Sequence, residues 1–266
     1  MVKEYYRPES LGEALDLLAR PGALALAGGT YALAFEARDK PERVVDLASV
    51  LPRAVEAKGG ALSIGAGATF QELIESEAIP SAIKAAAATM SNRNTRNRAT
   101  VGGNLGANKS CSSLAPVLLA LGASATIAER GKAPATTSLE SWIAAPRGVI
   151  LSVEVRLEPG LKVAALRHSR TACDVATATA ACAFRLDGGK VAGLRIALGG
   201  FGPRATLRPD LAALFEGRPL PPKTDIEKSV SPLLSAISDV RGSAEYKRLR
   251  GAALVADALH AAEDLS

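Results

Sequence analysis

Short apolar runs that stop abruptly at glycine or proline recur along this chain of 266 residues, and they limit its possible folds more than any other feature. Each run suits a strand or a short helix. None approaches the roughly 20 apolar residues that a membrane span requires. Because 48% of the residues are hydrophobic, the chain can bury a substantial core in two or three compact units.

The short runs alternate irregularly between strand-like and helix-like patterns. We predict strands at residues 23–27, 43–47, 61–69, 124–129 and 149–157, and helices near residues 11–18, 70–74, 81–89, 113–122 and 244–262. Three pairs have the spacing of a helix-capping box, namely Ser10 with Glu13, Thr69 with Glu72, and Thr224 with Glu227. This irregular order predicts an α+β fold and argues against a doubly wound sheet.

A boundary between units is expected at Glu158, Pro159 and Gly160. Beyond it, residues 175–186 and 190–200 flank Asp187-Gly188-Gly189, which is the pattern of a hairpin. We therefore predict a first domain at residues 1–160, with subdomains of about 1–55 and 56–160. A smaller sheet-plus-helices domain is expected to follow at residues 161–266.

Two apolar pieces run into paired glycines, at residues 27–30 (AGGT) and 100–104 (TVGGN). We expect both to be strand ends at which successive backbone N–H groups can converge on a phosphate without obstruction by side chains. The spacing matches neither the phosphate-binding loop of ATPases nor the dinucleotide fingerprint of Rossmann folds. Three arginines at residues 93, 96 and 98 precede the second pair and add attraction for an anion.

Composition excludes several kinds of site. Three cysteines without a CxxC spacing, Cys111, Cys173 and Cys182, indicate neither a disulfide framework nor a cysteine-bound metal. With only His168 and His260, a histidine-rich metal site is not expected either. The net charge of +5 is spread without interleaved aromatics, so we predict no nucleic-acid partner. The polar start and the lack of a membrane span favour a cytoplasmic protein.

An ordered set of motifs resembles the FAD-carrying subunit of the xanthine dehydrogenase and carbon monoxide dehydrogenase family of molybdenum hydroxylases. The pieces are YYRPESLGEALDLL at 5–18, LAGGT at 26–30, VVDL at 44–47, LSIGAGAT at 62–69, RNRATVGGNL at 96–105, LAPVLLALGA at 114–123, ILSVEV at 150–155, GGFGPR at 199–204 and EYKRLRGAALVADAL at 245–259. The resemblance covers nearly the whole chain. It implies a two-subdomain FAD-binding domain of the PCMH type, followed by a small C-terminal domain.

By position, the resemblance implies which residues bind FAD. The two glycine segments would hold the phosphates, mainly through backbone amides, while Ile150 would lie beside the flavin ring and Arg167 near it. The implied cofactor-binding residues are Ala25, Leu26, Ala27, Gly28, Gly29, Thr30, Tyr31, Ala32, Thr100, Val101, Gly102, Gly103, Asn104, Ser113, Ile150 and Arg167. No catalytic or metal-binding residue is implied.

The chain departs from the family pattern at two of these positions. Tyr31 stands where the family often has a small polar residue, and Ser113 stands where an aspartate commonly contacts the nucleotide end of FAD. A serine hydroxyl can bond to ribose, but without the strength of a charged acceptor. We therefore expect looser binding at the adenosine end.

The resemblance implies an electron-transfer subunit that receives electrons from the [2Fe–2S] clusters of a partner and passes them to NAD+, oxygen or another acceptor. A molybdopterin-binding subunit would oxidise the organic substrate. Two alternatives stay open: a self-sufficient FAD-dependent reductase or oxidase of the same fold, and a structural subunit with weak or no FAD binding.

Overall fold

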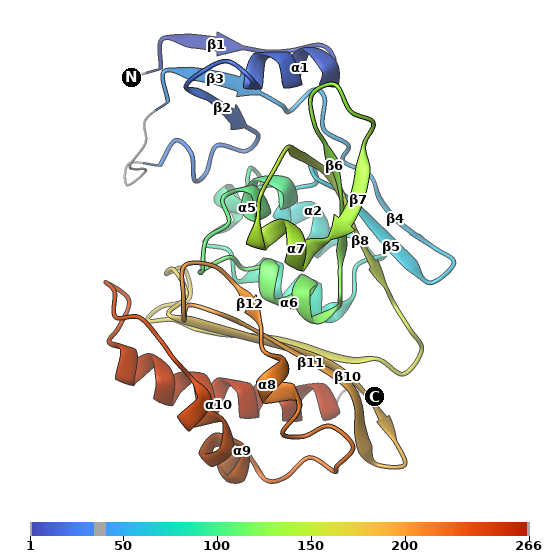
Figure 1. Cartoon of the computed structure of the whole chain (residues 1–266), viewed down its shortest axis with the longest axis vertical. Helices are drawn as coiled ribbons and strands as arrows, with labels where there is room; N and C mark the ends of the chain where they lie inside the picture. The colour runs from blue at the N-terminus through green and yellow to red at the C-terminus, as the bar shows by residue number, and fades with distance from the viewer. Residues whose placement is uncertain (1, 35–40, 265–266) are drawn as a thin grey trace.

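The computed structural model describes residues 2–34 and 41–264. Three β-sheets follow one another along the longest axis of the molecule, with helices packed between and beneath them (Figure 1). This is the α+β architecture expected from the irregular alternation of short runs. In the described part of the chain, no helix is long and apolar enough to cross a membrane.

The first sheet is small and parallel, with the strand order β1-β3-β2. Its elements are β1 (Glu4–Tyr6), α1 (Leu11–Leu18), β2 (Ala23–Leu26) and β3 (Arg43–Asp46). Helix α1 begins as predicted, because the Ser10 hydroxyl accepts a hydrogen bond from the amide of Glu13. Its buried residues Ala14 and Leu17 cover the sheet and join the main core.

The second sheet has five antiparallel strands in the order β4-β5-β8-β6-β7. The strands are β4 (Val55–Lys58), β5 (Ala61–Gly65), β6 (Ser124–Ala128), β7 (Ala135–Ser138) and β8 (Val149–Arg156). The accompanying helices are α2 (Phe70–Glu75), α3 (Ser81–Ala88), α4 (Arg93–Arg96), α5 (Val101–Gly106), α6 (Ala115–Ala120) and α7 (Leu139–Ala144). The predicted box of Thr69 and Glu72 caps α2, and Gly122, with φ +68°, follows α6.

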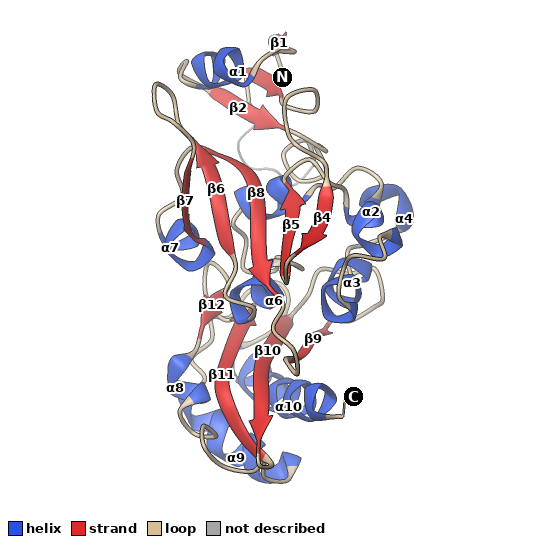
Figure 2. Ribbon diagram, turned by 90° about the vertical axis from the view of Figure 1, so that its right-hand side faces the viewer, coloured by secondary structure: helices blue, strands red, loops and turns tan. Residues whose placement is uncertain are grey.

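The third sheet has four antiparallel strands in the order β12-β11-β10-β9 (Figure 2). Its strands are β9 (Lys162–His168), β10 (Ala178–Asp187), β11 (Lys190–Gly199) and β12 (Thr206–Leu207). Its helices are α8 (Pro209–Ala212), α9 (Lys223–Val230), the 3-10 turn η1 (Ser231–Leu233) and α10 (Ala244–Glu263). The predicted hairpin joins β10 to β11, with positive φ at both Gly188 and Gly189.

Strand β10 is buried on both faces. Successive side chains of a strand point to opposite faces, so alternate residues of β10 pack against different neighbours. Ala181 and Ala183 belong to the core shared with the middle of the molecule, where α6 packs closely. Cys182 and Phe184 point into a second core, which α10 covers. Small side chains on one face therefore let the third sheet dock tightly against the rest of the chain.

Two predictions about individual elements were wrong. Residues 101–106 form helix α5, although we expected residues 100–104 to be a strand end. Helix α9 begins after Pro222 without a side-chain cap, so Thr224 and Glu227 do not form the predicted box. Strands β1, β4, β7, β9 and β12 were not predicted.

Candidate functional site

The first glycine segment leaves β2 at the end that faces α5 (Figure 1). Gly29 has φ +72°, a backbone conformation that glycine adopts without strain. A Cβ at Gly28 would lie 1.7 Å from the carbonyl oxygen of Arg98, and the Arg98 side chain donates from Nε to the Gly28 oxygen at 3.2 Å. The first glycine segment therefore meets the chain directly before the second one, which is far away in sequence.

The backbone of the first segment has free donors. The amides of residues 28–32 donate no hydrogen bond to any described residue. Thr30 and Tyr31 are exposed, while Ala25 and the buried Leu26 belong to the preceding strand. A loop with several unpaired N–H groups and a left-handed glycine can wrap an anionic oxygen. The first segment has the geometry expected of a phosphate site.

The second glycine segment is built differently. Thr100 caps α5, and the amides of all four following residues already donate to oxygens of the chain. Val101 donates to Ala68 at 2.9 Å, Gly102 to Ala66 at 2.8 Å, Gly103 to the Thr100 hydroxyl at 3.0 Å, and Asn104 to the Thr100 oxygen at 2.9 Å. The expectation that these amides bind a phosphate does not fit this geometry, because hydrogen bonds of the fold already occupy them.

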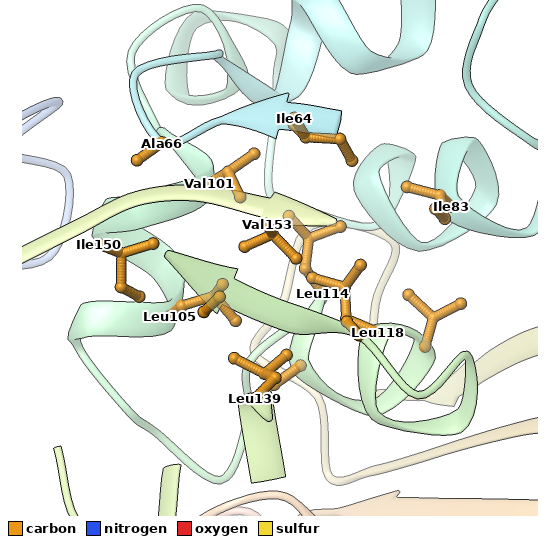
Figure 3. Packing of buried hydrophobic residues seen from close by; sticks show 14 of the residues in the cluster. Ile64, Ala66, Ile83, Val101, Leu105, Leu114, Leu118, Leu139, Ile150 and Val153 are labelled. Atoms are coloured by element: carbon orange, nitrogen blue, oxygen red, sulfur yellow. The ribbon is translucent and has the colours of Figure 1, made fainter. Parts of the chain in front are cut away.

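The glycines of the second segment instead let the backbone pack closely at one position and leave it accessible to solvent at the next. A Cβ at Gly102 would lie 2.8 Å from that of Ala66, whereas Gly103 is exposed. Figure 3 shows Val101 beside Ala66, and Leu105 of α5 beside Ile150 of β8. Ile150 is buried, with 4% of its surface exposed, so only its backbone can face a ligand. The side chain of Asn104 accepts a hydrogen bond from Ser112 at 2.6 Å.

Tyr31 and Lys109 connect the first segment to the loop between α5 and α6. The Lys109 ammonium lies over the Tyr31 ring, 5.1 Å from its centre. At an exposed site such a cation–π contact contributes about 0.5–1 kcal/mol. A hydrogen bond to a charged group contributes about 1.5–3 kcal/mol, so the ammonium would exchange the ring for an adjacent phosphate.

Ser113 and Arg167 lie together, although the sequence separates them. Both line a small pocket between α3, α6 and strands β9 and β10, with Thr89 and Thr179 nearby. The hydroxyl of Thr179 is buried and has no hydrogen-bond partner within the part of the chain that is described. An unpartnered buried hydroxyl at so small a pocket indicates a place for an ordered water.

Arg167 also holds the local backbone together. Its guanidinium donates to the carbonyls of Thr89 at 2.8 Å and of Asp174 at 2.9 Å, and to that of Ala172. Burial lowers the pKa of Arg167, and the neighbouring Cys173 and Asp174 oppose that change. The residue remains a cation beside the pocket, and it joins the end of α3 to the loop after β9.

Comparison with known proteins identifies the family. Residues 1–155 match the profile described as the FAD binding domain in molybdopterin dehydrogenase, and residues 165–262 match the CO dehydrogenase flavoprotein C-terminal domain. The chain belongs to this FAD-binding family. The resemblance seen in its motifs is therefore confirmed, and FAD is its cofactor.

Individual relatives extend over the whole chain. The protein YgfM of Escherichia coli K12 is 32% identical and aligns over 97% of this chain and 95% of its own length. The xanthine dehydrogenase FAD-binding subunit of Escherichia coli O157:H7 is 29% identical, with 91% and 90% covered. The carbon monoxide dehydrogenase structure from Hydrogenophaga pseudoflava superposes with a TM-score of 0.91 at 26% identity, over 99% of this chain and 98% of that one.

The residues fit a dinucleotide cofactor. Amides that donate to no described residue follow Gly28, and Gly103 is exposed. A small, mostly apolar pocket, which contains the unpartnered Thr179 hydroxyl, lies between Ser113 and Arg167. Sequence reasoning missed Lys109 and Thr179, because neither belongs to a motif and each gains its place only through the tertiary fold.

Proposed function

We propose that this chain is the electron-transfer subunit of a molybdenum hydroxylase complex. Its FAD would accept electrons from [2Fe–2S] clusters of an iron–sulfur partner and pass them to NAD+, oxygen or another acceptor, while a molybdopterin-binding partner oxidises the substrate. The observation that carries this proposal is the cradle of free amides at residues 28–32, within a chain that matches such subunits from end to end.

The cysteines support the need for a partner. A [2Fe–2S] cluster of the ferredoxin type takes four thiolates, and the whole chain has three cysteines. Cys182 is fully buried in the second core, where burial raises the pKa of its thiol to about 12. Within this proposal, cluster electrons would therefore come from another chain. The exposed free thiol of Cys173 supports a cytoplasmic location, where thiols stay reduced.

Exposed apolar side chains on neighbouring loops also support assembly with other subunits. Val175, Ile237, Val240 and Tyr246 are all large and exposed, and Val240 is 94% exposed. The Arg241 side chain, through its bond to the Ala176 carbonyl, holds two of the contributing loops together. Large exposed apolar side chains are consistent with a surface that another protein covers.

Within this proposal the chain's own residues bind and orient the cofactor. The amides of residues 28–32 would hold the pyrophosphate, and the Thr100 and Asn104 side chains would lie on the opposite wall. The Arg167 cation would stand near the flavin ring and favour its reduced anion. Ser113 lines the same pocket, so it would lie beside Arg167 and not at the nucleotide end where we expected it. FAD supplies the redox chemistry. The division at about residue 160 is part of the same proposal, and the connection between β8 and β9 at residues 157–161 supports it.

Purification from the native host through a tag on this chain tests the role. We expect a complex with bound flavin and about four irons per flavin, as two [2Fe–2S] clusters require. In that complex the substrate should bleach the flavin absorbance before the acceptor reoxidises it. A tagged chain that comes out alone, yellow and able to turn over a substrate without partners would support the self-sufficient reductase or oxidase. A colourless chain that FAD does not colour would favour the structural subunit.

A further inference from the structure

The charge pattern around the second glycine segment is one-sided. No aspartate or glutamate stands between Glu77 and Glu129, while five lysines or arginines do. Arg93 pairs with Glu75, and Arg96 bonds to Gln71 and to backbone carbonyls. Arg98 and Lys109 have no carboxylate partner among the described residues, and both lie against the first glycine segment.

Lys109 has a more specific position than a solvated surface lysine. Its ammonium lies over the ring of Tyr31, which directly follows Gly29 and Thr30 in the loop with free amides. The contact joins residues far apart in sequence and brings a cation with no carboxylate partner among the described residues to the edge of the cradle. The aromatic ring attracts the ammonium more weakly than a phosphate does. The lysine is therefore held near the anion site, and no carboxylate in the described part of the chain neutralises it.

From this geometry we propose that Lys109 is the side chain that binds the pyrophosphate of FAD in this protein, and that Tyr31 positions it. This inference rests on the FAD-carrying role proposed above. The free amides of residues 28–32 supply the neutral donors, and Lys109 supplies the charge. When the phosphates enter, the ammonium moves from the ring to a phosphate oxygen. The role of Tyr31, which is an unusual residue after a glycine pair, is thus to hold the Lys109 ammonium near the phosphate site.

Titration of the full-length apoprotein, followed by quenching of flavin fluorescence, tests the role of Lys109. Lys109→Met should weaken FAD binding about tenfold, as expected for the loss of one charge-assisted hydrogen bond. It should also reduce the dependence of FAD affinity on salt. Lys109→Arg should retain most of the affinity. The control is Lys190→Met at the exposed tip of the β10–β11 hairpin, at the other end of the molecule from β2 (Figure 2), which should bind as the wild type does.

Two further ligands locate the effect at the phosphates. ADP, which carries the diphosphate without the flavin, should lose the same factor as FAD in competition experiments with Lys109→Met. Riboflavin, which has no phosphate, should bind the variant and the wild type equally. An equal loss for riboflavin would mean that the substitution damages the fold, and it would overturn the proposal.

A double-mutant cycle tests the positioning role of Tyr31. Tyr31→Leu should weaken FAD binding about threefold in the wild-type background and have no effect in the Lys109→Met background, because the two residues act as a unit. Tyr31→Phe keeps the ring and should leave the affinity unchanged. Additive losses would show that Tyr31 does not act through Lys109.

The outcomes separate the two proposals. If the wild-type chain binds FAD and Lys109→Met binds it equally well, the inference about Lys109 is wrong and the proposed function stands. If the wild-type chain binds FAD and Lys109→Met loses affinity, but the native complex contains no iron, the proposed electron-transfer role is wrong and the phosphate site stands.

Discussion

Gly28 shows how one residue can determine whether two distant segments meet. Its α-carbon lies against the Arg98 carbonyl, and an added Cβ would stand 1.7 Å from that oxygen. A change of rotamer cannot relieve this clash, because the backbone fixes the positions of both the Cβ atom and the carbonyl oxygen. Glycine at this position therefore allows the two loops to approach closely. That contact positions the amides of the residues that follow.

Gly28→Ala should lower the free energy of unfolding by about 2–3 kcal/mol, the upper range for overpacking, and should weaken FAD binding because the amide cradle must shift. Gly12→Ala is the matched control: no atom lies within 4 Å of an added Cβ there, and the residue is in α1. It should stabilise the protein by about 0.5–1 kcal/mol through helix propensity. Denaturant unfolding measures both. Equal effects would refute the proposed packing role of Gly28.

At the scale of elements, a buried ion pair ties α10 to the loop before it. Lys247 is completely buried, and its Nζ lies 2.8 Å from an oxygen of Asp239. Burial alone would raise the pKa of Asp239, but hydrogen bonds from Arg241 and Lys247 outweigh it and hold that pKa well below its usual range. The loop and the first turns of α10 thus depend on one carboxylate.

Asp239→Asn should cost about 3–5 kcal/mol of unfolding free energy at pH 7, because it leaves Lys247 charged, buried and unpaired. A depressed carboxyl pKa contributes stability above the unfolded value of about 4. That contribution disappears as the pH falls through the lower, folded value. The difference between wild type and variant should therefore stay constant from about pH 7 to 5 and shrink below about pH 4.

The double variant Asp239→Asn with Lys247→Met is the control for this pair. Removing the orphaned cation should recover most of the loss, because an apolar side chain fits a buried site without a partner. A variant pair whose losses simply add would show that the carboxylate stabilises the loop through Arg241 alone.

The same scale shows what the sequence could and could not predict. The caps of α1 and α2 and the turn at Gly188-Gly189 depend on neighbours a few residues apart, and all three were predicted. Helix α5 was missed because two glycines lower helix propensity by about 2 kcal/mol. Its stability comes from the Thr100 cap and from packing of Val101 and Leu105 in the core. Tertiary contacts of that kind leave no local pattern.

In the candidate site, too, local features could be predicted from the sequence and tertiary contacts could not. The free amides after Gly28 were expected, because the turn itself is local. The meeting of Gly28 with Arg98, 70 residues away, and of Ser113 with Arg167 in one pocket depends on how the sheets pack. Lys109 was missed for this reason: only the fold brings it to Tyr31.

For the whole molecule, FAD should act as a structural link. Among the described residues, the segment after β2 meets the middle of the molecule at Gly28, at Arg98 and through the Tyr31–Lys109 contact. A dinucleotide bound across this junction stabilises only the state in which both walls are in place. At a free FAD concentration 100 times the dissociation constant, the gain is about 2.7 kcal/mol.

That gain should raise the melting temperature of the apoprotein by roughly 5–10 °C, given the usual entropy of unfolding for a chain of this size. Riboflavin at the same concentration should produce a smaller rise, because it cannot engage the amides after Gly28. Hydrogen exchange should show the new protection at β2 and residues 25–32 and no change in the β10–β11 hairpin. Protection that rises equally in all three sheets would contradict a local link, and would mean that FAD binding is coupled to the folding of the entire chain.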